Sequence, residues 1–166
     1  MVSTLASDSL HRWRMWRGWQ GRDTWAVFYD PESETSLMFG DQVPESWVER
    51  WRAQGKKQLI CQAEIFPILV AKTTWEPLLS CRAVLWFVDN NSALAAVIRS
   101  FSPVVENFEL LLINANLDVK LQSLNWYSRV PSKSNLSDSP SRMDFHELTA
   151  KGFRRCQPVY ETLTIK

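Results

Sequence analysis

The sequence has little net charge and no long apolar run. Its 166 residues include 19 Lys or Arg and 18 Asp or Glu, which gives a net charge of +1 at pH 7. This balance excludes a strong overall field that would draw the whole protein to nucleic acid, so any phosphate contacts must come from local patches. We find no signal peptide and no run long enough to cross a bilayer. We therefore expect an intracellular protein of the cytoplasm or nucleus, with no membrane partner.

Cysteine is also scarce. The three cysteines, Cys61, Cys81 and Cys156, are an odd number and lack the spacing of zinc ligands. They predict free, buried thiols in a reducing compartment rather than a disulfide framework. The sequence has no internal repeat and no low-complexity tract. Its length suits a single domain with one core.

Tryptophan, in contrast, is abundant. The chain has nine tryptophans, and four of them lie within the first 25 residues. Residues 11–22 alternate arginines with aromatic rings, a mixture that suits phosphate contact and base stacking. The same segment also suits an insertion that packs on the domain, or an arm that contacts neighbouring domains. We predict that it forms a loop. Its basic and aromatic residues are Arg12, Trp13, Arg14, Trp16, Arg17, Trp19 and Arg22.

Hydrophobic periodicity predicts alternating strands and helices. Strands are expected at residues 1–6, 24–29, 35–39, 83–88 and 121–130. Helices are expected at 44–51, 59–79, 93–101 and 102–117, and a short one between 142 and 153. A turn at residues 30–33 joins the second and third strands into a hairpin, and Pro67 should kink its helix or lie in the first turn. This order predicts an α/β fold, a mixed sheet with helices on its faces.

Three acidic residues lie at positions where burying a carboxylate costs free energy or where a carboxylate can bind a ligand. Glu64 shares a helical face with apolar residues, Asp89 follows a buried strand, and Asp138 lies in a polar loop. Each has an ordinary explanation: an ion pair for Glu64, a helix cap for Asp89, and solvation for Asp138. Mg²⁺ accounts for all three together, because it prefers carboxylate oxygens and binds alongside substrate phosphate. Two such ions can activate water for phosphodiester hydrolysis.

The sequence around these acids resembles the ribonuclease H domain of retroelement reverse transcriptases. Residues 62–71 are similar to the long helix that carries the family's catalytic Glu. Residues 85–93 are similar to its central strand and the Asp that ends it, and residues 130–142 are similar to its closing motif. The resemblance covers about residues 25–143. It implies a ribonuclease H-like domain at residues 1–143, with the basic Trp-rich insertion at about 10–22, and a C-terminal extension at 144–166.

The resemblance also implies an activity and its residues. Glu64, Asp89 and Asp138 would be catalytic metal ligands for Mg²⁺ or Mn²⁺, and the reaction would be endonucleolytic hydrolysis of the RNA strand of an RNA–DNA hybrid. The partners would be the hybrid, read through its shape and 2′-hydroxyls, and other domains of a retroelement polyprotein. Backbone contacts near the acids are expected from a set of polar and basic residues: Lys56, Lys57, Asn91, Ser92, Arg129 and Lys133.

Two features depart from the family pattern. The family's first Asp lies on the first strand; here either Asp8 fills that role as the fourth ligand, or Leu5 stands in its place and the site is damaged. Asp23 and Asp30 are poorer candidates for that role. The loop before Asp138 also lacks the His of many cellular relatives. The first strand has little room before it, so we expect an N-terminally truncated or divergent domain.

These departures leave alternatives open. The domain is either an active hybrid nuclease or a catalytically inactive module kept for structure or nucleic-acid binding. A third reading is another member of the same superfold, such as a transposase or integrase core, which would act on DNA.

Overall fold

A mixed six-stranded sheet forms the centre of the described structure. The computed structural model describes residues 10–12, 23–53, 59–88, 90–129, 145–161 and 163. The strands are β1 (Leu10–Arg12), β2 (Asp23–Asp30), β3 (Thr35–Gln42), β4 (Ala83–Val88), β5 (Leu124–Arg129) and β6 (Arg154–Arg155). Their order is β5-β4-β1-β2-β3-β6. β1, β2 and β3 pair antiparallel, whereas β1–β4, β4–β5 and β3–β6 are parallel.

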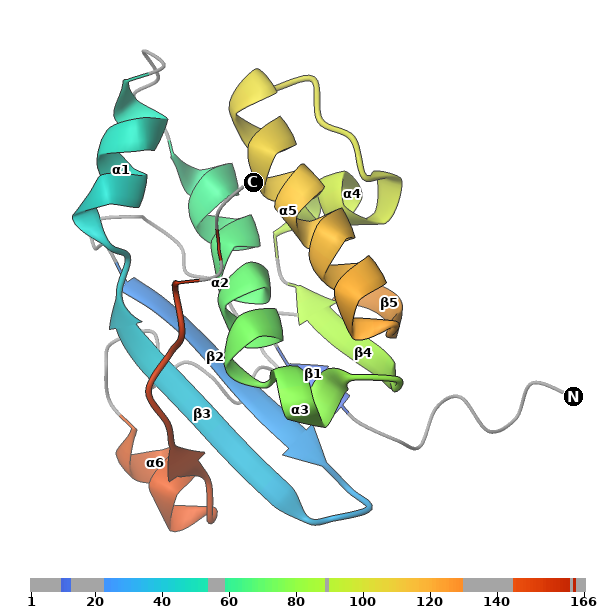
Figure 1. Cartoon of the computed structure of the whole chain (residues 1–166). Helices are drawn as coiled ribbons and strands as arrows, with labels where there is room; N and C mark the ends of the chain where they lie inside the picture. Colours follow the sequence, from blue (N-terminus) through green and yellow to red (C-terminus); the bar gives the residue numbers. More distant parts are fainter. Residues whose placement is uncertain are drawn as a thin grey trace, which may run out of the picture.

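Helices cover one face of this sheet (Figure 1). They are α1 (Glu45–Arg52), α2 (Ile60–Thr74), α3 (Glu76–Leu79), α4 (Asn91–Arg99) and α5 (Val105–Leu121). The sixth helix, α6 (His146–Ala150), packs on the opposite face. α2 contacts β2, α4 and α5, and α4 also contacts β4 and β5. In the part of the chain that the structure describes, no helix is both long and apolar enough to cross a membrane.

The main core lies between the sheet and these helices. β4 shows why: its buried residues Val84, Trp86 and Val88 alternate with less buried ones, so one face of the strand points into the core. On the helix side, the ring of Phe66 packs against Trp47 and Trp51, with ring centres 5.2 and 5.4 Å apart. Each such buried ring contributes about 1.5–3 kcal/mol of transfer free energy.

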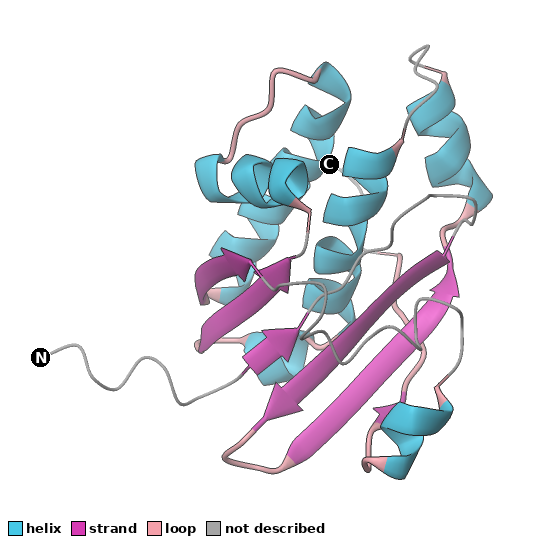
Figure 2. Cartoon of the chain, turned by 180° about the vertical axis from the view of Figure 1, so that it is seen from behind, coloured by secondary structure: helices cyan, strands magenta, loops and turns pink. Residues whose placement is uncertain are grey.

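The opposite face of β2 and β3 has its own small core. Trp25, Val27 and Met38 are buried there against Leu148 of α6. The segment after α6 then crosses back: β6 pairs with β3, and Leu163 is buried in the main core. The described residues after 144 therefore pack against both faces of the sheet (Figure 2).

The predicted α/β fold with a mixed sheet is confirmed, and so is its hairpin. β2 and β3 pair along their whole length, and the turn between them is closed by Asp30, whose carboxylate accepts hydrogen bonds from Ser33 Oγ at 2.7 Å and Glu32 N at 3.1 Å. This is the local bonding that makes Asp a turn residue.

Some predictions were wrong. The helix expected at 59–79 is two helices, because the chain leaves α-helical geometry at Trp75 before α3 begins. Pro67 lies inside α2 rather than in its first turn, where its missing N–H leaves the Ala63 carbonyl without the usual helical donor. β1 includes His11 and Arg12, which were expected in a loop, and β6 was not predicted at all.

The thiols are free as predicted, but not all are buried. Cys61 and Cys156 are partly covered, whereas Cys81 is exposed. Cys156 accepts a hydrogen bond from the indole N–H of Trp75 at 3.3 Å. Burial raises the pKa of the Cys156 thiol, against the smaller opposing effect of that hydrogen bond, so this group stays protonated and unreactive near neutral pH.

Candidate functional site

The first part of the candidate site is the junction between β4 and α4. β1 and β4 run parallel, with Leu10 opposite Leu85, so their carboxyl ends lie at the same edge of the sheet. Asn90 caps α4: its Oδ1 accepts hydrogen bonds from the N–H groups of Ser92 at 2.8 Å and Ala93 at 3.0 Å. The junction is therefore a strand end directly followed by a capped helix N-terminus, an arrangement that favours anionic ligands.

Glu64 is the second part. It lies on α2, and its exposed fraction is only 3%. Ile68 and Ala71, on the same helical face, are completely buried, which confirms the predicted placement of an acid on an apolar face. A carboxylate so far from water favours an arrangement in which a cation or strong donors compensate its charge.

Three of the four predicted metal ligands, Asp8, Asp89 and Asp138, lie outside the described residues, so only Glu64 is placed. Within the described ranges, no three His, Cys, Asp or Glu side chains lie close enough together to hold a metal ion. The metal-binding roles therefore stay predictions.

The predicted nucleic-acid contacts divide in the same way. Asn91 and Ser92 are exposed in the first turn of α4, and Arg129 is exposed at the end of β5. Lys56, Lys57 and Lys133 lie outside the described residues, as does the Arg- and Trp-rich segment after Arg12. The predicted contact residues that the structure places thus lie just after β4 and at the end of β5, and their role stays a prediction.

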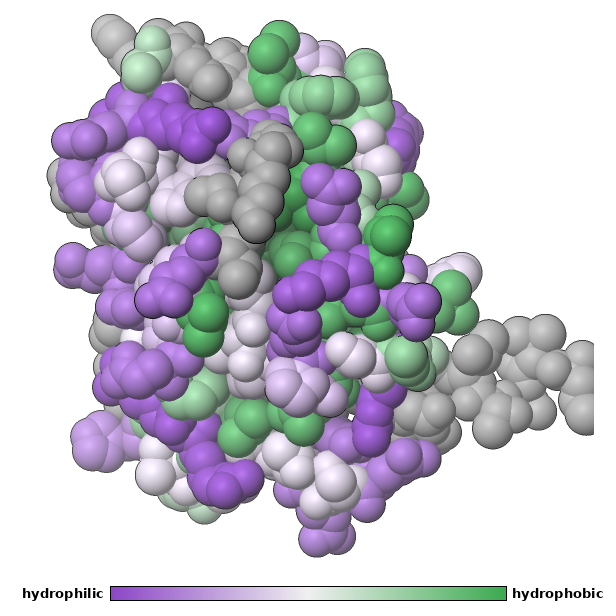
Figure 3. Space-filling model, in the orientation of Figure 1, coloured by the Kyte–Doolittle hydropathy of each residue, from purple (hydrophilic) through white to green (hydrophobic). Residues whose placement is uncertain are grey.

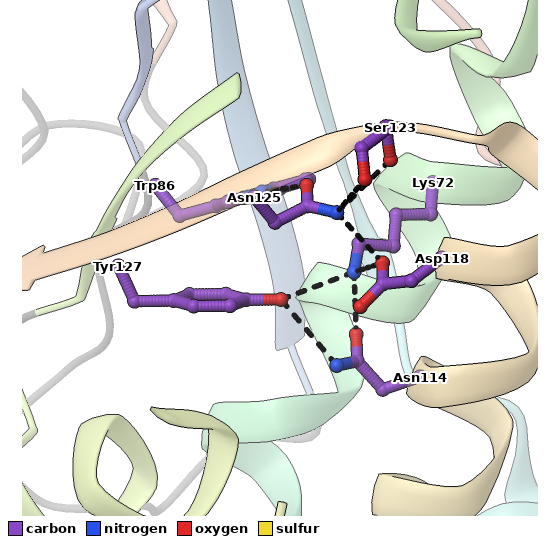
Figure 4. A network of polar contacts seen from close by, with 7 residues as sticks. All are labelled: Lys72, Trp86, Asn114, Asp118, Ser123, Asn125 and Tyr127. Atoms are coloured by element: carbon purple, nitrogen blue, oxygen red, sulfur yellow. Dashed lines mark hydrogen bonds and ion pairs between the residues drawn. The ribbon is translucent and has the colours of Figure 1, made fainter. Parts of the chain in front are cut away.

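A buried polar network near β5 was not predicted (Figure 4). Lys72 of α2 has no exposed surface. Its ammonium group donates hydrogen bonds to Asn114 Oδ1 at 2.7 Å and Tyr127 OH at 3.1 Å, and it also pairs with Asp118. A buried ammonium group is tolerated only when its donors and its charge are satisfied in this way.

The network continues to the sheet through Asn125. Its Nδ2 donates to Asp118 Oδ1 at 2.9 Å, and its Oδ1 accepts a 2.6 Å bond from the indole N–H of Trp86. Burial raises the pKa of Asp118, and the charge and hydrogen bond of Lys72 oppose this only in part. The network ties α2 and α5 to β4 and β5, and so fixes the strand that precedes the predicted Asp138 loop.

Sequence contained a signal for this network. Lys72 interrupts an otherwise apolar helix, and Asn114 and Asp118 are spaced four residues apart on one face of α5. The partners are more than 40 residues apart along the chain, so the pairing itself depends on the fold.

Comparison with known protein families and with curated protein sequences finds no match to this chain.

Proposed function

We propose that this chain is a ribonuclease H-like domain that hydrolyses the RNA strand of RNA–DNA hybrids. The observation that carries the proposal is the buried carboxylate of Glu64 on an apolar helix that packs against α4, the helix directly after Asp89. The acids follow one another along the chain as the resemblance to retroelement ribonuclease H implies: a Glu on the first long helix, an Asp after a central strand, and an Asp in a closing loop.

The mixed sheet supports the proposal. β4 lies inside the sheet between β1 and β5. Asp89 therefore follows the central one of three parallel strands. Ligand sites of α/β sheets lie at the carboxyl ends of such strands. The helix-covered face and the antiparallel β1–β2–β3 ribbon are also compatible with such a fold.

The donor set fits Mg²⁺ or Mn²⁺. Asp8, Glu64, Asp89 and Asp138 offer only carboxylate oxygens, the hard ligands that these ions prefer. When bound, such ions supply an activated water and stabilise the leaving oxygen of a phosphodiester. Glu64, held rigidly in the α2–α4 packing, would keep one carboxylate in a fixed place with little water around it.

Substrate would be held by local groups, because the net charge of +1 gives no general attraction. Asn91 and Ser92 present exposed side chains at the N-terminus of α4, where a phosphate or a 2′-hydroxyl can bind. Lys56 and Lys57 precede α2 in sequence, and Lys133 precedes Asp138. These residues contact backbone rather than bases, so the expected specificity is for hybrid shape.

A second candidate function is an inactive module that retains nucleic-acid binding or a structural role. Chain order favours it: Asp8 comes before β1, whereas Asp89 comes after β4, and these two strands run parallel. In chain order, Asp8 precedes the amino end of β1 and Asp89 follows the carboxyl end of β4. Because the two strands are parallel, these are opposite ends of the strand pair. If no other acid completes the set, the site lacks a ligand.

Cleavage assays separate these functions. The full chain is incubated with Mg²⁺ and, in separate reactions, an end-labelled RNA–DNA hybrid, single-stranded RNA and duplex DNA of the same sequence. The proposal predicts cuts only in the RNA strand of the hybrid. Binding of the hybrid without cleavage would establish the inactive module, and cleavage of duplex DNA alone would favour a transposase or integrase core.

A further inference from the structure

β5 ends the sheet on one side, and its outer edge is open as far as the described residues extend. In the described part of the chain, β4 is its only strand partner. Leu124 donates its N–H to Arg82 O at 2.9 Å, so the backbone groups of Leu124, and of every second residue after it, point toward β4. The N–H and C=O groups of Asn125, Tyr127 and Arg129 therefore point away from the sheet.

One face of this edge strand is apolar and exposed. Leu124 and Trp126 have exposed fractions of 61% and 73%, and both lie on the face opposite the helices. Natural edge strands usually carry lysine, proline or a bulge that discourages pairing with another chain. β5 has no lysine or proline and pairs with β4 without a bulge, and its one charged side chain, Arg129, lies at its end, so the strand can pair with a further one.

The other face of the strand borders a pocket of about 360 Å³ with a mixed polar and apolar lining. Consecutive residues of β5 line it together with the end of α4, so the pocket opens past the strand edge. Asp118 lies in its wall; Oδ1 accepts from Lys72 and Asn125, but Oδ2 accepts no hydrogen bond from the described residues. Lys72 is buried behind Asp118 and pairs with Oδ1, so among the described lining residues the acceptor left for a further donor is Oδ2. The pocket therefore suits a guanidinium or ammonium group.

We propose that β5 pairs antiparallel with β5 of a second copy of this chain, with the two-fold axis at Tyr127. The six outward-facing residues, three from each chain, then form a ladder of six backbone hydrogen bonds. In this register Asn125 lies opposite the partner's Arg129, and opposite residues of an antiparallel pair project from the same face. The partner's Arg129 therefore points toward the pocket beside Asn125, within reach of Asp118 Oδ2.

Three features favour a second copy over an unrelated peptide. Arg129 is exposed and has no ion pair with the described residues. In the symmetric dimer, Arg129 of each chain can bind Asp118 of the other, so this contact forms twice. On the apolar face, the same axis places Trp126 diagonally across from its symmetry mate, where aromatic side chains reach each other. Tyr127, at the axis, is already held by Lys72 and stacked on Trp86, so little ordering is needed before the strands pair.

This dimer does not depend on the proposed nuclease activity. It does use Arg129, one of the predicted substrate contacts, and so leaves the backbone-binding role to Lys56, Lys57, Lys133 and the α4 N-terminus. The sheet would continue through both copies, and the candidate sites at the carboxyl ends of β4 would face opposite directions.

Sedimentation velocity of the full chain tests the proposal. At tens of micromolar we expect a species of twice the 19.3 kDa monomer mass. Arg129→Pro removes one outward N–H and the guanidinium per chain but no hydrogen bond to β4, a change that edge strands tolerate. It should raise the dimer Kd at least about tenfold, since each 1.4 kcal/mol is a factor of ten. Arg129→Asp keeps the backbone donor and should weaken the dimer through charge alone.

The matched control is Val119→Lys. Val119 is 78% exposed and belongs to α5 rather than to β5; apolar side chains, drawn green, also reach the surface on the face shown in Figure 3. The proposal predicts an unchanged dimer. A monomer at every concentration, or a dimer lost in Val119→Lys but kept in both Arg129 variants, would overturn it.

Cross-linking tests the register directly. Trp126 and the partner's Ser128 form a non-hydrogen-bonded pair, whose Cα atoms lie about 4.5 Å apart, within the range of a disulfide. In a Cys81→Ser background, oxidising a mixture of Trp126→Cys and Ser128→Cys proteins should give a covalent dimer containing one chain of each. Equal yields from Val119→Cys mixed with Ser128→Cys would contradict the register.

Discussion

The ammonium of Lys72 lies 5.3 Å from the centre of the Trp86 ring, which stacks on Tyr127 in the neighbouring strand. A cation over an aromatic face in a dry site is attracted to it. The same ammonium pairs with Asp118 and donates to Asn114, so one buried charge holds α2 to α5 and to both parallel strands.

Lys72→Met should destabilise the protein strongly. It keeps the volume of the side chain but leaves Asp118 without its counter-charge, and breaking a buried pair on one side costs about 3–5 kcal/mol. Urea unfolding at pH 7 measures the loss. Lys120→Met is the control, because Lys120 pairs with Glu76 on the surface at 2.7 Å and such pairs contribute less than about 1 kcal/mol. Similar losses in the two variants would contradict the role given to the network.

Asp30 makes the free energy of unfolding depend on pH in the acidic range. Burial disfavours its charge, but the hydrogen bonds from Ser33 and Glu32 and the charge of Arg82 outweigh burial, so the pKa of Asp30 lies below its usual value. A carboxyl whose pKa is lower in the folded state stabilises the fold above its unfolded pKa, about 3.9. This contribution is lost as pH falls through the folded pKa.

Asp30→Asn should therefore lower the free energy of unfolding by about 1–2 kcal/mol at pH 6. The difference from wild type should shrink below about pH 4, where the native carboxyl also becomes protonated. Denaturant unfolding at a series of pH values checks this, and a difference that stays constant down to pH 2 would rule out the ionised carboxylate as its source.

Gly40 is a point of close approach between β3 and the C-terminal segment. A Cβ built there lies 2.2 Å from the Phe145 ring, whose face is covered by the guanidinium of Arg155 at 4.7 Å. Gly40→Ala should displace Phe145, loosen residues 145–155 and cost about 1–3 kcal/mol. Limited proteolysis should then cut this segment faster. Gly152→Ala meets no atom within 4 Å but sits at φ +87°, so it should cost about 1 kcal/mol through backbone strain alone, without loosening Phe145.

Glu64→Gln separates catalysis from stability. The substitution keeps the shape of a side chain that is 3% exposed and removes only its charge, so the variant should still fold, and its free energy of unfolding is measured beside its cleavage rate. Hybrid cleavage should fall at least about 100-fold, as for groups that hold a catalytic metal. Glu49→Gln, on the exposed side of α1, is the control and should leave both quantities unchanged. Full cleavage by Glu64→Gln would remove Glu64 from the proposed site.

Local chemistry made much of the fold predictable. The β4 prediction at residues 83–88 matches the strand residue for residue, because an unbroken apolar run followed by Asn90 and Ser92 marks both the strand and the next helix cap. The hairpin was predictable because Asp30 makes its turn through bonds to nearby residues. Burial of Glu64 followed from helical spacing with Ile68 and Ala71.

Features that depend on distant partners were not predictable. β1 and β6 have three and two residues, too few for a periodic signal, and exist through their pairing with β2, β4 and β3. The Lys72–Asp118 pair joins two helices that meet only in the folded state. For the site itself, sequence order alone relates Glu64 to Asp8, Asp89 and Asp138, and their common metal remains a proposal.

Cleavage of an end-labelled RNA–DNA hybrid in Mg²⁺ by the wild-type chain, Asp89→Asn and Asp8→Asn, measured side by side, tests whether this protein is a metal-dependent hybrid nuclease. We expect the wild type to cut only the RNA strand and Asp89→Asn to lose about 10- to 100-fold of this activity or more. A matching loss in Asp8→Asn would identify the fourth ligand. A wild-type chain that cuts no hybrid, or an Asp89→Asn variant that cuts as fast as wild type, would contradict the account.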